Sequence, residues 1–162
     1  MIKEVTGDIL FSSAKAIAHG IAPNDHLDHG LALALRERWP SLAKDFRHWH
    51  HEAHPKAGDV WTWTAPDGTR VFNLLTQEPA TSEKGHPGPA RLEHVNHALR
   101  ALRRELEATK PGSVALPRLA TGVGGLEWAD VRPLVEKHLG ELGIPVYVYT
   151  RYEAGKKADE RP

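Results

Sequence analysis

A glycine-rich turn in the second half of the chain has the composition of an anion-binding loop. Gly122, Gly124 and Gly125 lie between an apolar strand-like segment, residues 113–117, and a helical pattern that begins near Trp128. Glycine lets backbone N–H groups approach a ligand closely, and a helix N-terminus favours negative charge. The turn predicts a phosphate or diphosphate site, although the same three glycines are equally typical of a tight strand-to-helix connection.

A second loop occupies the same position between a strand and a helix. Residues 20–35 leave the apolar segment 16–21 and enter a helical pattern at Gly30. The loop carries two carboxylates and two imidazoles: Asp25, His26, Asp28 and His29. Two such loops at one edge of a sheet are suited to holding one diphosphate between them.

Polar residues near these loops are candidates for acid–base chemistry. His19 lies within the strand-like segment, and an imidazole of near-neutral pKa can act as a general base for water. A buried structural histidine is the alternative interpretation. Asp25, Asp28 and Glu78 are carboxylates that could position a water, but aspartate in a loop is also ordinary turn chemistry. The catalytic candidates are therefore His19, Asp25 and Asp28.

A histidine-rich segment, residues 47–55, has a superficial likeness to a zinc site. His50 and His54 are four residues apart, but the sequence lacks the His-Glu-x-x-His arrangement. A solvated helix surface is therefore predicted, with no metal site and no cofactor. Trp61 and Trp63 alternate along one strand, which favours core packing over stacking on nucleic acid.

The elements that must position these residues alternate between strands and helices. Strands are predicted at residues 2–5, 16–21, 59–64, 70–76, 113–117 and 145–150. Helices are predicted at residues 30–40, which Pro40 would close, and at 45–54, 89–108 and 128–143. This order predicts an α/β fold with helices on both faces of the sheet and a ligand at the carboxyl ends of the strands.

Composition limits the class of protein. The 162 residues suit one domain, and 21 basic residues balance 21 acidic ones, so no overall basic field indicates nucleic acid. The absence of cysteine excludes disulfides and thiolate nucleophiles. With no long apolar run and no signal-peptide pattern, a cytoplasmic location without membrane contact is expected. The polar tail at residues 152–162 is predicted to be disordered.

Five short segments together resemble macrodomains. They are "GDIL" (7–10), "AHGI" (18–21), "HGLALAL" (29–35), "LPRLATGVGGLEW" (116–128) and "VYVYT" (146–150). The likeness covers residues 1–151 and is closest to the branch of terminal ADP-ribose protein glycohydrolase and the antitoxin macrodomains that remove ADP-ribose from DNA. It implies a monomeric three-layer α/β/α domain with a central mixed sheet and an ADP-ribose cleft.

The resemblance also implies which residues contact the ligand. Asp8 matches the acidic group that accepts from the adenine amine, although a cap on the turn after Gly7 is the simpler interpretation. Two loops, at 29–31 and 121–126, match those that hold the diphosphate and distal ribose. The full set of expected binding residues is Asp8, Ile9, Ala18, Gly20, His29, Gly30, Leu31, Gln77, Thr121, Gly122, Val123, Gly124, Gly125 and Leu126.

The chain departs from this branch at two positions. Gln77 stands where the hydrolases have a nucleophilic lysine, and Gly124 stands where the terminal glycohydrolase has an assisting aspartate. Lys84 follows in a Gly/Pro-rich loop, where a solvated lysine is the expected state and a lysine reaching the cleft is the alternative. A lysine adduct is therefore not expected at position 77.

Two main functions follow from the resemblance. The first is an ADP-ribosyl hydrolase that releases ADP-ribose from a modified protein, a nucleic acid or a small ester by attack of a positioned water. The second is a reader that binds ADP-ribose without turnover, which the loss of the lysine favours. A third is a phosphatase that acts on ADP-ribose 1″-phosphate through His19.

Overall fold

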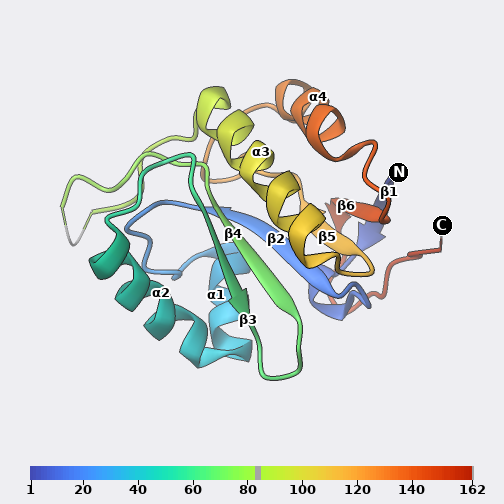
Figure 1. Ribbon diagram of the computed structural model, residues 1–162, viewed down its shortest axis with the longest axis horizontal. Helices are drawn as coiled ribbons and strands as arrows, with labels where there is room; N and C mark the ends of the chain where they lie inside the picture. The colour runs from blue at the N-terminus through green and yellow to red at the C-terminus, as the bar shows by residue number, and fades with distance from the viewer. Residues whose placement is uncertain (83–84, 162) are drawn as a thin grey trace.

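The computed structural model describes residues 1–82 and 85–161, which form one α/β domain (Figure 1). The strands are β1 (Ile2–Gly7), β2 (Ala16–Ile21), β3 (Val60–Thr64), β4 (Arg70–Leu75), β5 (Val114–Pro117) and β6 (Val146–Tyr152). The helices are α1 (Gly30–Arg38), α2 (Pro40–Ala53), α3 (Leu92–Thr109) and α4 (Trp128–Leu139), with a 3₁₀ turn η1 (Ile9–Phe11) after β1.

The six strands form one mixed sheet in the order β1-β6-β5-β2-β4-β3. All neighbouring pairs are parallel except β3 and β4, which are antiparallel. The antiparallel pair is a hairpin whose connection lies at residues 65–69. The mixed sheet expected from the resemblance is therefore confirmed.

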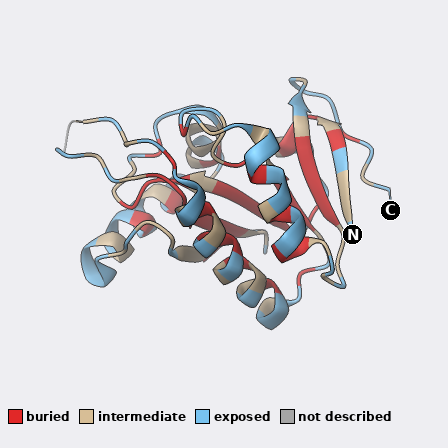
Figure 2. Ribbon diagram, turned by 90° about the horizontal axis from the view of Figure 1, so that it is seen from above, coloured by how far each residue is buried: buried red, intermediate tan, exposed pale blue. Residues whose placement is uncertain are grey.

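Alternating side chains on the strands divide the core into two layers. On β2, Ile17 and Ile21 pack in a cluster with Leu35 of α1 and Phe46 of α2. Ala16 and Ala18 of the same strand belong to the opposite cluster, which contains the apolar faces of α3 and α4. Figure 2 shows the buried residues concentrated in the strands and in the helix faces turned toward them. This is the expected three-layer α/β/α arrangement.

The sheet opens between β2 and β5 near the carboxyl ends of these strands. β5 pairs with β2 only through Val114 and Ala115, opposite Ala16 and Ile17. On its other side β2 pairs with β4 along its whole length, as far as Ile21. The last residues of β2 and β5 therefore diverge, and the loops that follow the two strands face each other across the gap.

Several helix boundaries differ from the predictions; α3, for example, begins at Leu92 and not at residue 89. Pro40 begins α2 instead of only ending the preceding helix, because a proline at the first helical position loses no hydrogen bond and has a helical φ. The predicted helix 45–54 is thus wrong at its start. Helix α4 ends at Leu139, not at 143, and Gly140 caps it. None of the helices in the described ranges has the length and apolar character needed to cross a membrane.

The segment after β6 is packed against the sheet rather than detached from it. Residues 153–161, called the tail below, bury Ala158 and place the Glu160 carboxylate against Ser12, Ser13 and Tyr149. This differs from the disorder predicted for residues 152–162. Composition predicted disorder because the tail is polar, whereas the structure satisfies its polar groups with specific partners on β1, η1 and β6.

Candidate functional site

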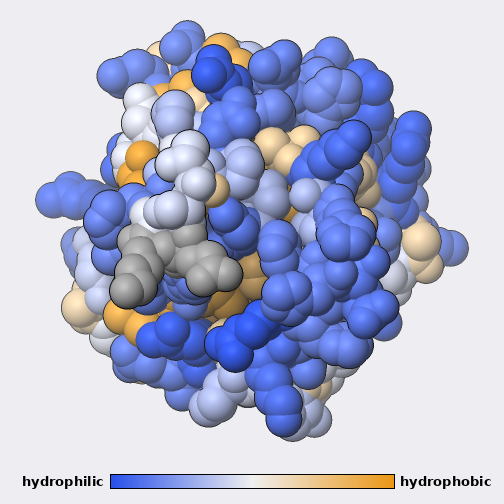
Figure 3. All heavy atoms as spheres, turned by 90° about the vertical axis from the view of Figure 1, so that its left-hand side faces the viewer, coloured by the Kyte–Doolittle hydropathy of each residue, from blue (hydrophilic) through white to orange (hydrophobic). Residues whose placement is uncertain are grey.

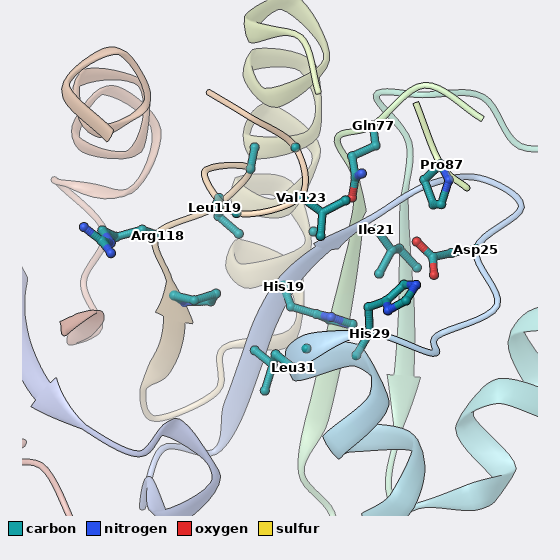
Figure 4. A pocket seen from close by; sticks show the side chains of 17 residues that line it. His19, Ile21, Asp25, His29, Leu31, Gln77, Pro87, Arg118, Leu119 and Val123 are labelled. Carbon is teal, nitrogen blue, oxygen red and sulfur yellow. The ribbon is translucent and has the colours of Figure 1, made fainter. Parts of the chain in front are cut away.

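A cavity of about 290 Å³ lies where β2 and β5 diverge (Figure 4). Its walls come from the end of β2, the β2–α1 loop and the β5–α4 loop. In the close view, His19, Ile21, Asp25 and His29 lie on one side and Leu119 and Val123 on the other, with Gln77 above them. The predicted residues that line it are His19, Gly20, Asp25, His29, Gly30, Leu31, Gln77, Gly122, Val123 and Gly124.

The N-terminus of α1 opens on this cavity. Gly30, Leu31 and Ala32 line it, and the N-cap residue His29 makes no side-chain capping hydrogen bond. The first N–H groups of α1 are therefore available to an anion. Gly30 has a φ of +55°, a conformation in which glycine is favoured over other residues. Of the two helix N-termini that the sequence placed near the site, that of α1 lines the cavity, whereas Trp128 at the start of α4 does not.

The three glycines of the β5–α4 loop have three different roles. Gly122 faces open space, because a Cβ there would meet no atom within 4 Å. Gly124 is packed tightly, since a Cβ would lie 2.6 Å from the Ala120 carbonyl oxygen and 2.8 Å from the Ala90 Cβ. Gly125 has a φ of +80°. Of the three, Gly122 alone both lines the cavity and faces open space; close packing requires glycine at 124, and the positive φ favours it at 125.

This difference predicts opposite outcomes for two matched substitutions. Gly124→Ala is expected to lower the free energy of unfolding by about 1–3 kcal/mol, because backbone atoms of Ala120 must shift. Gly122→Ala is expected to change it by less than about 0.5 kcal/mol. Urea unfolding of both variants measures the difference, and equal stabilities would contradict the packing role of Gly124. The same contacts leave no room for an aspartate at position 124 in this loop.

His19 is buried at the cavity and held by Asn73 on the neighbouring strand. Its Nε2 lies 2.6 Å from Asn73 Oδ1. Asn73 Nδ2 donates to the carbonyl oxygens of Trp61 and Val71, so the amide oxygen must face the imidazole. His19 Nε2 therefore carries the proton and donates it to Asn73. This assigns the lone pair to Nδ1.

Burial lowers the pKa of His19, against the opposing effects of the Asn73 hydrogen bond and the Asp25 charge. The imidazole is therefore neutral at neutral pH. Within the described residues, no hydrogen bond to Nδ1 is found. His19 is a neutral base fixed in one tautomer at the wall of the cavity, which combines the two alternatives that the sequence left open.

The other carboxylate candidates have structural partners. Asp25 lines the cavity, but its two oxygens accept from the backbone N–H groups of Ala22 and Leu27 and so shape the loop. Asp28 is half exposed, lies 3.5 Å from its neighbour His29, and does not line the cavity. Glu78 accepts from His94 and Arg91, which lower the pKa of its carboxyl group. Asp25 alone remains beside His19.

Gln77 lies in the cavity wall, where the resemblance implied it. It is 7% exposed, and its Nε2 donates to the Gly88 carbonyl oxygen at 3.2 Å. The side chain is therefore a fixed amide with no nucleophilic nitrogen. Lys84, the alternative amine, lies outside the described residues.

A second cavity, of about 450 Å³, continues the first on the side of β1. Gly30, Leu31 and Pro117 line both cavities. Asp8 and Ile9 lie in the wall of the second cavity, and Asp8 is 5% exposed. The two cavities thus form one cleft that runs from Asp8 to His19 past the N-terminus of α1.

A third cavity, of about 650 Å³, adjoins the cleft at its other end. Asp25 lines both the first and the third cavity. The remaining walls come from α2 and the loop after β4, with apolar Phe46 beside Arg47 and His51. Figure 3 shows this side of the molecule as mainly hydrophilic, with small apolar areas between polar side chains. The cleft therefore has space beyond its His19 end.

Some predicted binding residues lie away from these cavities. Ala18 is fully buried in the core layer of α3 and α4, and the Thr121 hydroxyl donates to the Arg118 carbonyl oxygen. Gly125 and Leu126 likewise do not line the cleft. His54 caps α2 with a φ of +47°, so it does not share a helix face with His50. The described part of the chain contains no group of three or more His, Asp or Glu side chains arranged for a metal ion.

The structure adds cleft residues that the sequence did not indicate. They are Ile21, Ala32, Pro87, Pro117, Arg118, Leu119 and Ala120 around the first cavity, and Gly7, Leu10, Ala34, Tyr149 and Tyr152 around the second. Figure 4 shows the Arg118 side chain turned away from His19 and Gln77. Tyr149 and Tyr152 could have been found from the pairing of β6 with β1, because this pairing brings them beside Asp8.

Solved structures share the fold of this chain. A macrodomain protein from Streptomyces coelicolor matches the chain with a TM-score of 0.74 and 29% identity, over 96% of this chain and 100% of that one. The chain has the macrodomain fold. The cleft from Asp8 to His19 contains part of the set of binding residues that the resemblance implied.

Curated relatives of the macrodomain carry names of ADP-ribose hydrolases. A DNA ADP-ribosyl glycohydrolase from Thermus aquaticus is 24% identical over 160 residues, 96% of this chain and 43% of that protein. The human ADP-ribose glycohydrolase OARD1 is 22% identical over 151 residues, 92% of this chain and 91% of that protein. The macrodomain spans less than half the length of the Thermus relative. No family model matches the sequence.

Proposed function

We propose that this macrodomain binds ADP-ribose and hydrolyses an ADP-ribosyl linkage by attack of a water that His19 activates. The observation that carries the proposal is the continuous cleft whose two cavities share Gly30, Leu31 and Pro117. The names of the Thermus and human relatives support the same class of activity.

ADP-ribose fits this cleft in one direction. The adenine lies in the second cavity, where Asp8 accepts from its exocyclic amine. The diphosphate lies at the N-terminus of α1 and against Gly122, where backbone N–H groups and the helix dipole favour negative charge. The distal ribose then lies in the first cavity beside His19 and Gln77. The third cavity provides space for the group from which ADP-ribose is released.

The chemistry follows from the state of His19. Its Nδ1 takes a proton from water as the water oxygen bonds to the anomeric carbon, and the bond from that carbon to the leaving group breaks. The leaving group departs with the bonding electrons. A carboxylate leaves without needing a proton, so ester-linked ADP-ribose is expected to be the best substrate and N-glycosidic linkages poor ones. Gln77 supplies no amine for a covalent adduct.

We expect the protein to release free ADP-ribose from ester-linked ADP-ribosyl substrates without a covalent intermediate. The measurement is incubation with ADP-ribosylated proteins and oligonucleotides, followed by mass spectrometry of the products. Borohydride is added to parallel reactions to trap any lysine adduct. A borohydride-stable adduct would contradict direct attack by water and would identify a lysine, such as Lys84, as the nucleophile.

The reader function gives a different result in the same assay. A reader binds ADP-ribose but releases none from any linkage. Gln77 favours this second candidate, because it replaces the lysine that the resemblance implies for the hydrolases. Calorimetry with ADP-ribose, expected to give a dissociation constant in the micromolar range or about −8 kcal/mol, provides the binding measurement for both functions.

A further inference from the structure

The tail, residues 153–161, contacts the wall of the cleft at its adenine end. Glu153 N–H donates to the Gly7 carbonyl oxygen at 3.2 Å, and Asp8 N–H donates to the Lys156 carbonyl oxygen at 2.7 Å. Ala158 is buried against the core. The tail is therefore joined to the backbone on both sides of the Gly7–Asp8 peptide bond.

Gly7 has no side chain at the point where the tail crosses it. A Cβ on Gly7 would lie 2.9 Å from the Lys156 carbonyl oxygen and 3.0 Å from the Ala158 Cβ. The first contact is closer than real Cβ atoms approach and the second is very tight, so a larger residue would force the tail to shift. The glycine before Asp8 thus indicates that the tail belongs to the folded domain.

The tail also orients the Asp8 carboxylate. Asp8 Oδ2 accepts from the backbone N–H of Gly155 at 2.9 Å, and Oδ1 accepts from that of Leu10 at 3.0 Å. Two fixed donors, one on each oxygen, define the plane of the carboxylate. Each oxygen keeps a further lone pair for a ligand. Without the Gly155 donor, only its own turn would hold the carboxylate.

Glu160 anchors the tail through three hydrogen bonds. Its carboxylate accepts from the Ser12 hydroxyl at 2.5 Å, the Ser13 N–H at 2.9 Å and the Tyr149 hydroxyl at 2.5 Å. Burial raises the pKa of Tyr149, and Glu160 raises it further, so the phenol keeps its proton and donates. Tyr149 itself lines the second cavity beside Asp8. Glu160 therefore fixes the position of Tyr149, one of the residues that line that cavity.

We propose that Glu160 is a positioning residue that sets the base specificity of the cleft. By anchoring the tail, it holds Gly155 against Asp8 and keeps the Asp8 carboxylate directed at the exocyclic amine of adenine. Hypoxanthine has a carbonyl oxygen in place of that amine, which a fixed carboxylate repels. A carboxylate free to turn avoids this repulsion and loses the directed bond to adenine. The inference rests on the proposed binding of ADP-ribose.

The test compares two ligands by calorimetry: ADP-ribose and its hypoxanthine analogue. The wild type is expected to prefer ADP-ribose by at least about tenfold, the worth of one hydrogen bond to a charged group. Glu160→Gln is expected to lower this preference about threefold to tenfold, mainly because the affinity for ADP-ribose falls. Ser12→Ala removes one anchor outside the cavity and is expected to lower it about twofold.

Asp159→Asn is the matched control. Asp159 is the neighbouring carboxylate, and it pairs with Arg161 and Lys3 at the surface. The control is expected to keep the wild-type ratio of affinities. Thermal unfolding is measured in parallel, because a merely structural role for Glu160 lowers the melting temperature without changing the ratio between the two ligands.

The outcomes separate this inference from the proposed function. If Glu160→Gln and Ser12→Ala bind both ligands with the wild-type ratio, Glu160 does not position Asp8 and the inference is wrong, while ADP-ribose binding stands. If the wild type does not bind ADP-ribose, the proposed function fails and the inference fails with it. A ratio that falls in both variants and not in Asp159→Asn supports the positioning role.

Discussion

Replacing His19 with glutamine is expected to lower the rate of ADP-ribose release by about 10²- to 10⁴-fold while ADP-ribose binding persists. Glutamine keeps an N–H donor for Asn73 Oδ1, so the buried partner on β4 stays satisfied. It lacks the basic Nδ1 that accepts the proton of the attacking water. The measurement is single-turnover release of ADP-ribose, with binding followed separately by calorimetry.

His138→Gln is the matched control for this substitution. His138 is also a buried imidazole whose Nε2 contacts an asparagine oxygen, that of Asn96 at 2.7 Å, and burial lowers its pKa as well. It joins α4 to α3 and does not line the cleft. Its variant is expected to release ADP-ribose at the wild-type rate. Loss of activity in both variants would show that the substitutions act by destabilising the protein and not by removing a general base.

The lowered pKa of His19 also predicts the pH dependence of release. A general base acts when unprotonated, and burial makes protonation of this imidazole harder than in water. The rate is therefore expected to be constant around neutral pH and to fall only in acid, below the ordinary histidine value of about 6.5. A midpoint above that value would indicate that another group is the base.

Replacing Asp8 with asparagine is expected to weaken ADP-ribose binding about tenfold to hundredfold. Asparagine has nearly the same shape and keeps one oxygen for the backbone N–H groups of Leu10 or Gly155. It loses the charge that strengthens the bond to the adenine amine, and its own amide hydrogens face a donor. Calorimetry with ADP-ribose measures the loss.

Asp67→Asn provides the comparison for Asp8. Asp67 caps the β3–β4 turn by accepting from the Thr69 N–H, which lowers the pKa of its carboxyl group, and it lines none of the three cavities. Its variant is expected to bind ADP-ribose with unchanged affinity. If the wild type and Asp8→Asn bind ADP-ribose with equal affinity, Asp8 does not recognise the adenine.

The sequence by itself determined the fold class and predicted where the candidate cleft lies. Alternating apolar segments predicted the strands, because a buried sheet requires apolar side chains on its strands whatever their order along the chain. Glycines at two strand-to-helix turns predicted the anion site, since a backbone that approaches an anion cannot carry a bulky side chain. The replacement of the lysine by Gln77 was likewise visible in the sequence, because the ability to act as a nucleophile depends on residue type.

Only the tertiary structure decided which residues act together. Of the two glycines Gly122 and Gly124, packing against Ala120 and Ala90 assigns the second to the loop itself. The protonation of His19 depends on Asn73, 54 residues away in sequence but opposite it in the sheet. The tail was predicted to be disordered because its composition is polar; its order comes from partners at Ser12 and Asp8, far away along the chain. Hydrogen bonds and close contacts between distant segments depend on strand order and register, which local sequence patterns do not specify.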